Sequence, residues 1–367
     1  MKSAIWLLTV LFAVETIFAD VPGRNRGMML CSWNVREDDI RTLASWGGNL
    51  ARYQMASGWG VDNANRDASA FNGWIDAKLD ELEKVLGWGA KYGVRIVVDL
   101  HVPPGGRAPG GEMNMFHEKE YADLFVGTWR RIARRFKGDK RIYGYDLINE
   151  PTNRKPSPEG LDWWSLQVAA AKAVRAEDPD MRVIIESNEW AQAKTFAKMK
   201  PVPLDNVVYQ VHVYMPHGYT HQGTGLKDAK PAGSLTWPDA ARGWGRDWLR
   251  ERLRPVREFQ LAQGARIYVG EFSASVWAPG AENYLADCIA LFKEYGWDWT
   301  YHALRESKSW NVELAPDATG NLAPSSDTLR KRALVNGFSK HNPNLKDGIR
   351  SLGEIVIRGA EARDKAD

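Results

Sequence analysis

Cysteine is scarce in this chain, which holds only Cys31 and Cys288 among its 367 residues. At most one disulfide can form, and it would require the two side chains to approach closely in the right direction. Cys31 belongs to an early apolar stretch and Cys288 to a late helical pattern, which disfavours that geometry. We expect two buried free thiols, although an exported protein could pair them.

The chain also lacks an excess of charge of either sign. It carries 49 basic and 46 acidic residues, for a formal net charge of +3. No strong field is then available to attract nucleic acid or an anionic membrane surface. Short basic runs such as Arg130-Arg131 fit the solvated outer face of a helix. The charge pattern therefore predicts neither a nucleic-acid partner nor a membrane partner.

Long apolar runs are missing after the first twenty or so residues, where no segment approaches the roughly 18 uncharged apolar residues of a membrane span. The start of the chain differs. Met1-Lys2 precedes the apolar run Ile5–Val14, and Ala19 offers a small residue at a suitable cleavage position. This pattern is typical of a secretory signal peptide. We therefore expect residues 1–19 to be removed and the mature protein to be a secreted monomer, in a periplasm or in the medium.

No Gly-x-Gly-x-x-Gly turn follows an early strand, which argues against a doubly wound open sheet. The chain has instead eight short apolar stretches separated by helical patterns, and this alternation predicts a single closed (β/α)8 TIM barrel of class α/β. The stretches are Gly27–Asn34, Asn49–Gln54, Arg95–His101, Ile142–Asn149, Arg182–Ser187, Val207–Tyr214, Arg266–Glu271 and Asp298–Leu304. The helical patterns include Ile75–Tyr92, Glu118–Phe136, Gly160–Glu177, Trp244–Gln263 and Ala281–Tyr295. We assign residues 20–345 to one catalytic domain and residues 346–367 to a polar tail.

Polar side chains gather at the ends of the predicted strands, which form the active-site face of such a barrel. In chain order they are Asn34, Arg52, His101, Asn149-Glu150, Ser187-Asn188-Glu189, His212 with Tyr214, Glu271, and His302 with Arg305-Glu306. Two of them, Glu150 and Glu271, are carboxylates that end separate apolar stretches. Two carboxylates facing each other in a cleft are the minimal equipment for cleaving a glycosidic bond.

This ordered set resembles the cellulase family of retaining glycosidases, glycoside hydrolase family 5. The resemblance covers about Gly27 to Leu304 and rests on Arg52, His101, Asn149-Glu150-Pro151, His212-x-Tyr214 and Gly270-Glu271-Phe272 in that order. It implies that Glu150 is the acid/base catalyst and Glu271 the nucleophile, with no cofactor. In a retaining enzyme the two carboxyl groups lie about 5–5.5 Å apart, and their repulsion keeps one of them protonated.

The resemblance also implies residues that support the nucleophile and the reacting sugar. Arg52 keeps Glu271 ionised, and Tyr214 donates its phenol to the same carboxylate. Asn149 reaches the sugar hydroxyl beside the reacting carbon, where its contact strengthens as positive charge develops on the ring.

Two histidines complete the implied set. His101 and His212 hold sugar hydroxyls or orient Glu150. Without the resemblance, His101 or Arg52 would equally well be a structural hydrogen-bonding residue.

Tryptophan is abundant, with 17 residues, and sugar enzymes use exposed indole rings as platforms for sugar C–H groups. Most are expected in the core, among them Trp129, Trp163, Trp164, Trp248 and Trp297. Those that follow strand ends are candidates for the cleft, namely Trp33, Trp59, Trp190, Trp277 and Trp310. The family usually has a tryptophan at the end of strand eight, and none is plainly in register here. Trp310 or Trp299 is expected to replace it.

The connection from Met215 to Gly243 is too long for a simple turn, and connections of that length usually have a function. It contains His217 and His221, whose spacing of four would suit a metal on a helix. Neighbouring proline and glycine argue against a helix, and no carboxylate completes the set. We therefore expect no metal and assign His221 to a sugar-binding loop.

Other chemistries stay open. Glu306 is a third strand-end carboxylate and could replace Glu271 as a catalytic partner. The chain could also be a carbohydrate-binding barrel without catalysis. A metal-dependent hydrolase or a Schiff-base lyase is disfavoured, because clustered His and Asp ligands and a lysine inside a strand are both missing.

The expected partner is a polysaccharide or an oligosaccharide. Within the family, endo-β-1,4-glucanase activity is the default expectation. Mannan, xyloglucan, β-1,3-glucan and exo-acting removal of side chains are the alternatives, since loop shape and hydroxyl contacts decide among them.

Overall fold

The computed structural model describes residues 23–31, 35–56, 67–226, 229–317 and 321–339. The predicted signal peptide, the polar tail, Asn34, Trp33 and Trp59 lie outside these ranges. Within them, no helix combines the length and the apolar character needed to cross a membrane.

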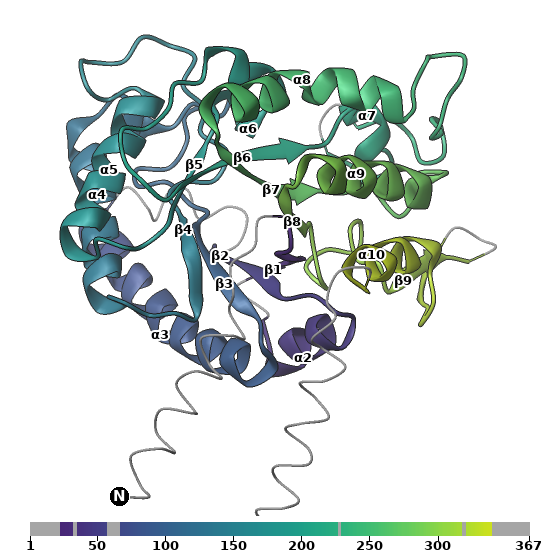
Figure 1. The fold of residues 1–367 in the computed structure, drawn as a ribbon, viewed down its shortest axis with the longest axis horizontal. Coiled ribbons are helices and arrows are strands. Elements are labelled where there is room, and N and C mark those ends of the chain that lie inside the picture. Colours follow the sequence, from purple (N-terminus) through teal and green to yellow (C-terminus); the bar gives the residue numbers. More distant parts are fainter. Residues whose placement is uncertain (1–22, 32–34, 57–66, 227–228, 318–320, 340–367) are drawn as a thin grey trace, which may run out of the picture.

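Eight parallel strands close into a barrel, in which each strand pairs with the next in sequence and the last pairs with the first (Figure 1). Their bounds are β1 Arg26–Cys31, β2 Leu50–Met55, β3 Arg95–Leu100, β4 Ile142–Asp146, β5 Val183–Glu186, β6 Val207–Val213, β7 Arg266–Phe272 and β8 Asp298–Tyr301. Each strand overlaps one of the eight predicted apolar stretches. The predicted (β/α)8 fold is therefore confirmed.

Helices surround the strands (Figure 1). The longer ones are α2 Glu37–Ser45, α3 Ala68–Tyr92, α4 Lys119–Arg135, α5 Trp163–Glu177, α8 Arg246–Gln263, α9 Ala281–Tyr295 and α10 Leu329–Ser339. Short elements are η2 Asn114–Phe116, α6 Asn188–Ala191, η3 Ala193–Lys198, α7 His217–Thr220 and the hairpin β9 Leu314–Pro316 with β10 Leu322–Pro324. Helix α3 begins before the predicted Ile75, because the Asp67 side chain accepts the Ala70 N–H at 2.8 Å and caps the first turn.

Side chains fill the inside of the barrel in layers. One apolar layer takes one residue from each of β2 to β7, namely Leu50, Val97, Tyr143, Ile184, Val208 and Tyr268. Two positions further along four of these strands stand polar residues that are at most 1% exposed, namely Arg52, Asp99, Glu186 and Gln210. Since side chains two apart share one face of a strand, this second layer lies between the apolar layer and the strand ends.

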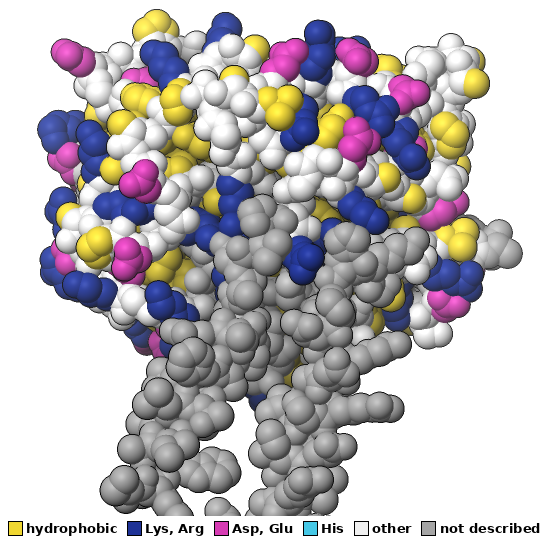
Figure 2. All heavy atoms as spheres, viewed as in Figure 1, with side chains coloured by type: hydrophobic (Ala, Val, Ile, Leu, Met, Phe, Trp, Pro, Cys, Tyr) yellow, Lys and Arg dark blue, Asp and Glu magenta, His cyan; other side chains and the backbone are white. Residues whose placement is uncertain are grey.

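The outer faces of the strands pack against the helices in one large apolar cluster. Trp129 and Trp297 are fully buried there, and Trp163, Trp164 and Trp248 pack against it from partly buried positions. Cys288 lies buried in α9 as a free cysteine, whereas the Cys31 side chain lies outside the described part. The face in Figure 2 shows basic and acidic side chains interspersed over the surface, as the balanced composition predicts.

Candidate active site

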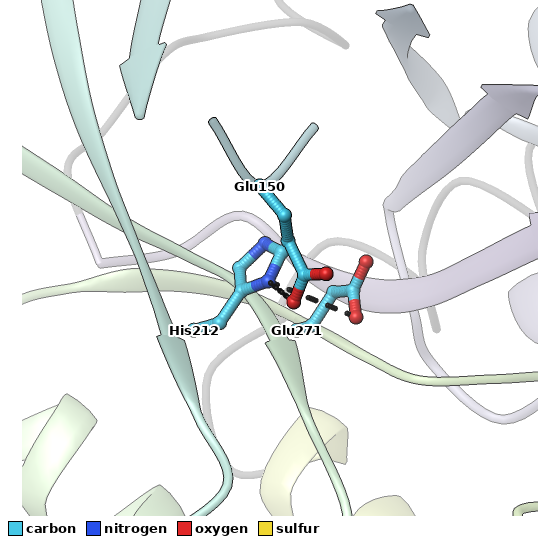
Figure 3. Close-up of side chains that lie close together, drawn as sticks. All are labelled: Glu150, His212 and Glu271. Carbon is cyan, nitrogen blue, oxygen red and sulfur yellow. Dashed lines mark hydrogen bonds and ion pairs between the residues drawn. The ribbon is translucent and has the colours of Figure 1, made fainter. Parts of the chain in front are cut away.

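Glu150 and Glu271 meet at the strand ends, where Glu150 follows β4 and Glu271 belongs to β7. One oxygen of each and a ring nitrogen of His212 all lie within 4.8 Å of one another. Figure 3 shows the imidazole of His212, on β6, directed at both carboxylates. All three residues line a cleft of about 620 Å³. The two predicted carboxylates therefore share one cavity.

The backbone of Glu150 adopts a left-handed conformation with φ of 51°, which costs a non-glycine residue about 1–3 kcal/mol. Two contacts hold it there. The N–H of Glu150 donates to Glu186 Oε2 at 2.8 Å, and the guanidinium of Arg107 donates to the carbonyls of Asn149 and Glu150 at 3.0 and 3.2 Å. This turn directs the carboxyl of Glu150 into the cleft.

Glu271 is surrounded by donors and positive charge. Its Oε1 accepts from Arg52 at 2.7 Å, and its Oε2 accepts from the Tyr214 hydroxyl at 2.8 Å. Burial alone would raise the pKa of Glu271, but its interactions with His212, His302 and Arg52 outweigh burial and hold the pKa far below its ordinary value. Glu271 is therefore ionised at neutral pH, as a nucleophile must be.

Arg52 is fully buried and serves four carboxylates at once. Its nitrogen atoms lie 3.2 Å from Asp99, 2.8 Å from Asp146, 3.1 Å from Glu186 and 2.7 Å from Glu271. Burial opposes the charge of Arg52, but the carboxylates keep its pKa well above the ordinary value.

One guanidinium cannot balance four negative charges in so dry a place. Burial raises the pKa of Asp146 to about 6 against the attraction of Arg52. Burial and the charge of Asp146 raise the pKa of Glu186 well above its usual range. Burial therefore favours the neutral form of Glu186, while the surroundings of Glu271 favour its carboxylate.

The strand-end residues predicted from the sequence do not include Glu186, Asp99, Asp146 or Gln210. A usable signal exists for three of them, because Asp99, Glu186 and Gln210 stand two residues from Val97, Ile184 and Val208 of the apolar layer. Strands of this kind are otherwise apolar, so a polar residue inside one marks an inward position. Asp146 has a weaker signal, since β4 is irregular against β3.

His212 connects the acid/base candidate to the buried layer. Its Nδ1 lies 3.1 Å from Glu150 Oε1 and 3.8 Å from Glu271 Oε2. Its Nε2 lies 3.1 Å from Nε2 of Gln210, whose amide also contacts Glu186. Gly270 makes room for that amide, since a Cβ there would lie 2.4 Å from the Gln210 side chain. The imidazole is thus well placed to orient the carboxyl of Glu150.

His101 and Asn149 form the adjoining wall of the cleft. The Nδ1 of His101 is paired with Asp99 Oδ2 at 2.8 Å. The Oδ1 of Asn149 accepts from Arg52 at 3.0 Å, and its Nδ2 lies 3.3 Å from His101 Nε2. Both residues line the cleft, where the amide of Asn149 is available to a sugar hydroxyl.

The carboxylate of Glu306 lies behind His302. Its Oε2 is 2.8 Å from His302 Nε2, and the Glu306 side chain is 5% exposed. Burial would raise the pKa of Glu306, but His302 lowers it below the ordinary value. Glu306 does not line the cleft, whereas His302 does. This placement favours Glu271 over Glu306 as the partner of Glu150.

Two of the candidate tryptophans line the cleft, Trp190 and Trp310. Trp299 instead packs on the helix side of β8, where its ring contacts Phe272 and Phe338. Trp277 packs beside Gly223. Of the two possible replacements for the strand-eight tryptophan, Trp310 is therefore the one beside the carboxylates.

The long connection after β6 also reaches the cleft. The segment His217–Thr220 forms a single helical turn, so the expectation of no helix there was wrong. The rings of His217 and His221 stack at 3.8 Å, and both line the cleft. Burial and the neighbouring His217 lower the pKa of His221 to about 3. Neutral His221 can present a hydrogen-bonding edge to a sugar.

Two strand-end residues point elsewhere. Arg305 pairs with Asp39 at 2.8 Å and with Glu313 at 2.6 Å, which ties the loop after β8 to helix α2. Glu189 pairs with Lys194 at 2.9 Å and is partly exposed. Neither lines the cleft, so the cleft contains only some of the predicted strand-end residues.

Among the described residues, one group of three His, Cys, Asp or Glu side chains has ligand atoms close enough to hold a metal ion, and it is Glu150, His212 and Glu271. The same spacing suits paired catalytic carboxylates. His217 and His221 belong to no such group.

The chain matches the family description "Cellulase (glycosyl hydrolase family 5)" over residues 19–308. Endoglucanase C of Acetivibrio thermocellus is 24% identical over 311 residues, which cover 77% of this chain and 88% of that protein. Cellodextrinase A of Ruminococcus flavefaciens is 27% identical over 245 residues, covering 65% of this chain and 68% of that protein.

Solved structures share the fold. Cel5A of Thermotoga maritima in complex with cellobiose superposes with a TM-score of 0.65 at 17% identity, covering 89% of this chain and 99% of that one. The same enzyme in complex with mannotriose gives a TM-score of 0.65 at 17% identity, covering 86% of this chain and 97% of that one.

Proposed function

This chain belongs to glycosyl hydrolase family 5, the cellulase family, and we propose that it acts as an endo-β-1,4-glucanase with a retaining mechanism. The observation that carries the mechanism is the closeness of the two carboxylates. Oxygens of Glu150 and Glu271 lie within 4.8 Å of each other. Inverting enzymes keep the carboxyl groups about 6.5–9.5 Å apart to admit a water, whereas retaining enzymes keep about 5–5.5 Å.

In the first step, ionised Glu271 attacks the anomeric carbon while protonated Glu150 gives its proton to the departing glycosidic oxygen. A covalent glycosyl ester on Glu271 and a free sugar chain result. In the second step, Glu150 removes a proton from water, the water oxygen attacks the anomeric carbon, and the bond to Glu271 breaks. The ionised state that Glu271 needs is set by its surroundings, since positive charge concentrates around it.

The surrounding residues stabilise charge as it develops. Arg52 and the Tyr214 hydroxyl hold the carboxylate of Glu271 in one orientation, so its attacking oxygen needs little reorganisation. The amide of Asn149 is oriented by Arg52 and lies at the cleft surface. We assign it to the sugar hydroxyl next to the reacting carbon.

Glucan is the favoured substrate because several relatives, among them Endoglucanase C of Acetivibrio thermocellus, are named endoglucanases. Mannan is the second candidate, because Cel5A of Thermotoga maritima has been solved with both cellobiose and mannotriose. Neutral His221 and the rings of Trp190 and Trp310 suit an uncharged sugar chain.

The deciding experiment measures reducing ends released from carboxymethylcellulose, mixed-linkage β-glucan, glucomannan, xyloglucan and laminarin. The wild-type protein and the Glu271→Gln variant are assayed in parallel. We expect release from the β-1,4-glucans, a rapid fall in viscosity typical of internal cleavage, and no release by the variant. Turnover of laminarin alone, or equal turnover by both proteins, would contradict the proposal.

We also propose that the protein is exported, on the strength of the apolar run Ile5–Val14 and of Ala19. Sequencing the N-terminus of the protein recovered outside the cytoplasm tests this. A mature chain that begins at Asp20 is the expected result, and an intact Met1 on exported protein would argue against cleavage.

A further inference from the structure

His302 occupies the wall of the cleft beside the proposed nucleophile. It follows β8 directly, its side chain is 13% exposed, and its Nδ1 lies 3.6 Å from Glu271 Oε2. Its ring is tilted against Trp310 at 5.8 Å. An imidazole that is nearly buried between two carboxylates has a chemistry that the two-carboxylate mechanism does not use.

The hydroxyl of Tyr214 stands between His302 and Glu271. It lies 2.5 Å from His302 Nδ1 and 2.8 Å from Glu271 Oε2. A phenol has one proton to donate, and burial together with Glu271 raises the pKa of Tyr214 well above its ordinary value. The single proton of Tyr214 can therefore point to Glu271 or to His302, but not to both.

The protonation of His302 decides between these two arrangements. When both ring nitrogens carry protons, Nε2–H donates to Glu306 at 2.8 Å and Nδ1–H donates to Tyr214, so the phenol must donate to Glu271. When the ring is neutral, Nε2 keeps its proton and its hydrogen bond to Glu306. Nδ1 then carries no proton and becomes an acceptor that competes for the phenol proton.

We propose that His302 is a positioning residue for the glycosidase reaction, which as an imidazolium tethered by Glu306 keeps the proton of Tyr214 directed at the nucleophile. The proposal rests on the proposed role of Glu271. Loss of the imidazolium removes one hydrogen bond and one nearby positive charge from Glu271, so the carboxylate becomes less well oriented for attack.

The charged and titratable groups that face His302 favour the imidazolium. Glu306 lies on its own loop, Glu271 on β7, Arg52 on β2, and Tyr214 and His221 after β6. Burial and Arg52 lower the pKa of His302, but Glu306 and Glu271 outweigh them and raise it to about 9. Neutral His221 adds no repulsion of its own. At neutral pH His302 is therefore an imidazolium, and the proton of Tyr214 is directed at Glu271. In mild alkali the ring becomes neutral and competes for that proton.

The test follows two groups by NMR in the full-length protein, without substrate. The ¹⁵N shifts of the His302 ring give its titration midpoint, and the ¹³C shift of the Glu271 carboxylate reports its hydrogen bonding. In wild type we expect both to change together near the same alkaline pH. In Glu306→Gln the common midpoint should fall by about one unit or more, because the nearest negative charge is gone. A carboxylate shift that ignores the His302 titration would overturn the proposal.

The Tyr214→Phe variant distinguishes the effect of His302 through the Tyr214 hydroxyl from the direct effect of its charge on Glu271. Without the hydroxyl, the shift of the Glu271 carboxylate across the His302 titration should shrink to less than about half, because only the through-space charge remains. An undiminished shift would show that Tyr214 relays nothing. This variant also serves if Glu306→Gln does not fold.

Kinetics gives the functional readout. Dinitrophenyl β-cellobioside needs little protonation of its leaving group, so loss of the Glu150 proton does not set the alkaline limb of kcat/KM. Glu306→Gln should move that limb to lower pH with the His302 midpoint, and lower kcat/KM about 2–10-fold near pH 8. Glu313→Gln is the matched control, since Glu313 pairs with Arg305 in the same loop, and it should leave the limb in place.

The outcomes are distinguishable from failure of the proposed function. Activity that survives in Glu271→Ala would refute the assignment of the nucleophile, whatever the NMR shows. A limb that stays in place in Glu306→Gln, while the His302 midpoint moves, would refute the positioning role and leave the glycosidase assignment intact.

Discussion

Arg52 and Glu271 form a 2.7 Å ion pair inside the barrel, in which Arg52 is fully buried and Glu271 is 6% exposed. The pair joins the floor of the cleft to the polar layer beneath it. Since the same guanidinium also contacts Asp99, Asp146 and Glu186, the state of the nucleophile depends on charges that no substrate touches.

Replacement of Arg52 by methionine is expected to destabilise the fold and inactivate the enzyme. Breaking a buried pair by removing one partner costs about 3–5 kcal/mol, and here several carboxylates lose their cation. Urea unfolding measures the loss of stability, and kcat on dinitrophenyl β-cellobioside measures the loss of activity. Arg305→Met is the matched control: it breaks ion pairs outside the cleft, so the folded fraction should keep its kcat. Wild-type kcat in the Arg52→Met variant would contradict this.

Glu150→Ala should affect substrates according to their leaving group. Loss of a general acid typically costs about 10²–10⁴-fold, and we expect that loss with β-glucan. Dinitrophenyl β-cellobioside needs little proton transfer, so its glycosylation step should fall less than about tenfold. Equal losses of kcat/KM on both substrates would overturn the acid/base assignment.

Glu186 is expected to tolerate glutamine better than alanine. Because its pKa is raised, the neutral acid is well mimicked by an amide, which can still accept from the Glu150 N–H. We expect kcat/KM to fall less than about tenfold in Glu186→Gln and about 100-fold in Glu186→Ala, where the left-handed turn loses its tether. An inactive glutamine variant that melts like wild type would show that Glu186 must ionise.

Trp310→Ala should weaken substrate binding more than it damages the fold. The indole lines the cleft and contacts the rings of Tyr214 and His221. Losing about 1–2 kcal/mol of ring contact with the sugar would lower kcat/KM about 5–30-fold, mainly through KM. Trp310→Phe keeps an aromatic face and should recover most of the lost kcat/KM. A phenylalanine variant as poor as the alanine one would point to the indole N–H instead.

The contributions of Glu271, Glu306 and His302 to stability should be lost at opposite ends of the pH range. The pKa values of Glu271 and Glu306 are lowered on folding, so the stability they contribute is present above about pH 4.5 and is lost as pH falls below it. The pKa of His302 is raised to about 9, so its contribution is complete below about pH 6.5 and is lost as pH rises through 9. Unfolding free energy at pH 6 should exceed that at pH 10 by about 1–3 kcal/mol, and Glu306→Gln should reduce the difference.

The barrel could be predicted because its strands are mostly apolar stretches that are followed by polar residues. His101, Glu150, His212 and Glu271 stand near or just beyond strand ends, where the fold itself makes them converge, whereas Arg52 lies inside β2. Glu186 and Gln210 escaped prediction because strands of a parallel barrel are read as uniformly apolar. Arg305 could not be placed from the sequence, since its direction depends on Asp39, which is remote in the chain and near in space.

Loop contents were the hardest to predict. The helical turn at His217–Thr220 is too short for any periodic pattern. The left-handed turn at Glu150 depends on Arg107 and Glu186, which arrive from two different elements. Such features follow from tertiary contacts and not from local propensity.

The apolar layer formed by Leu50, Val97, Tyr143, Ile184, Val208 and Tyr268 also decides how molecules travel. It plugs the barrel beneath the catalytic residues, so the cleft mouth serves as both entrance and exit. Under the proposed mechanism, the water that hydrolyses the covalent ester must enter by the opening that the released chain has just vacated. Water can therefore reach the ester only after the first product has left the cleft, and this fixes the order of the two steps.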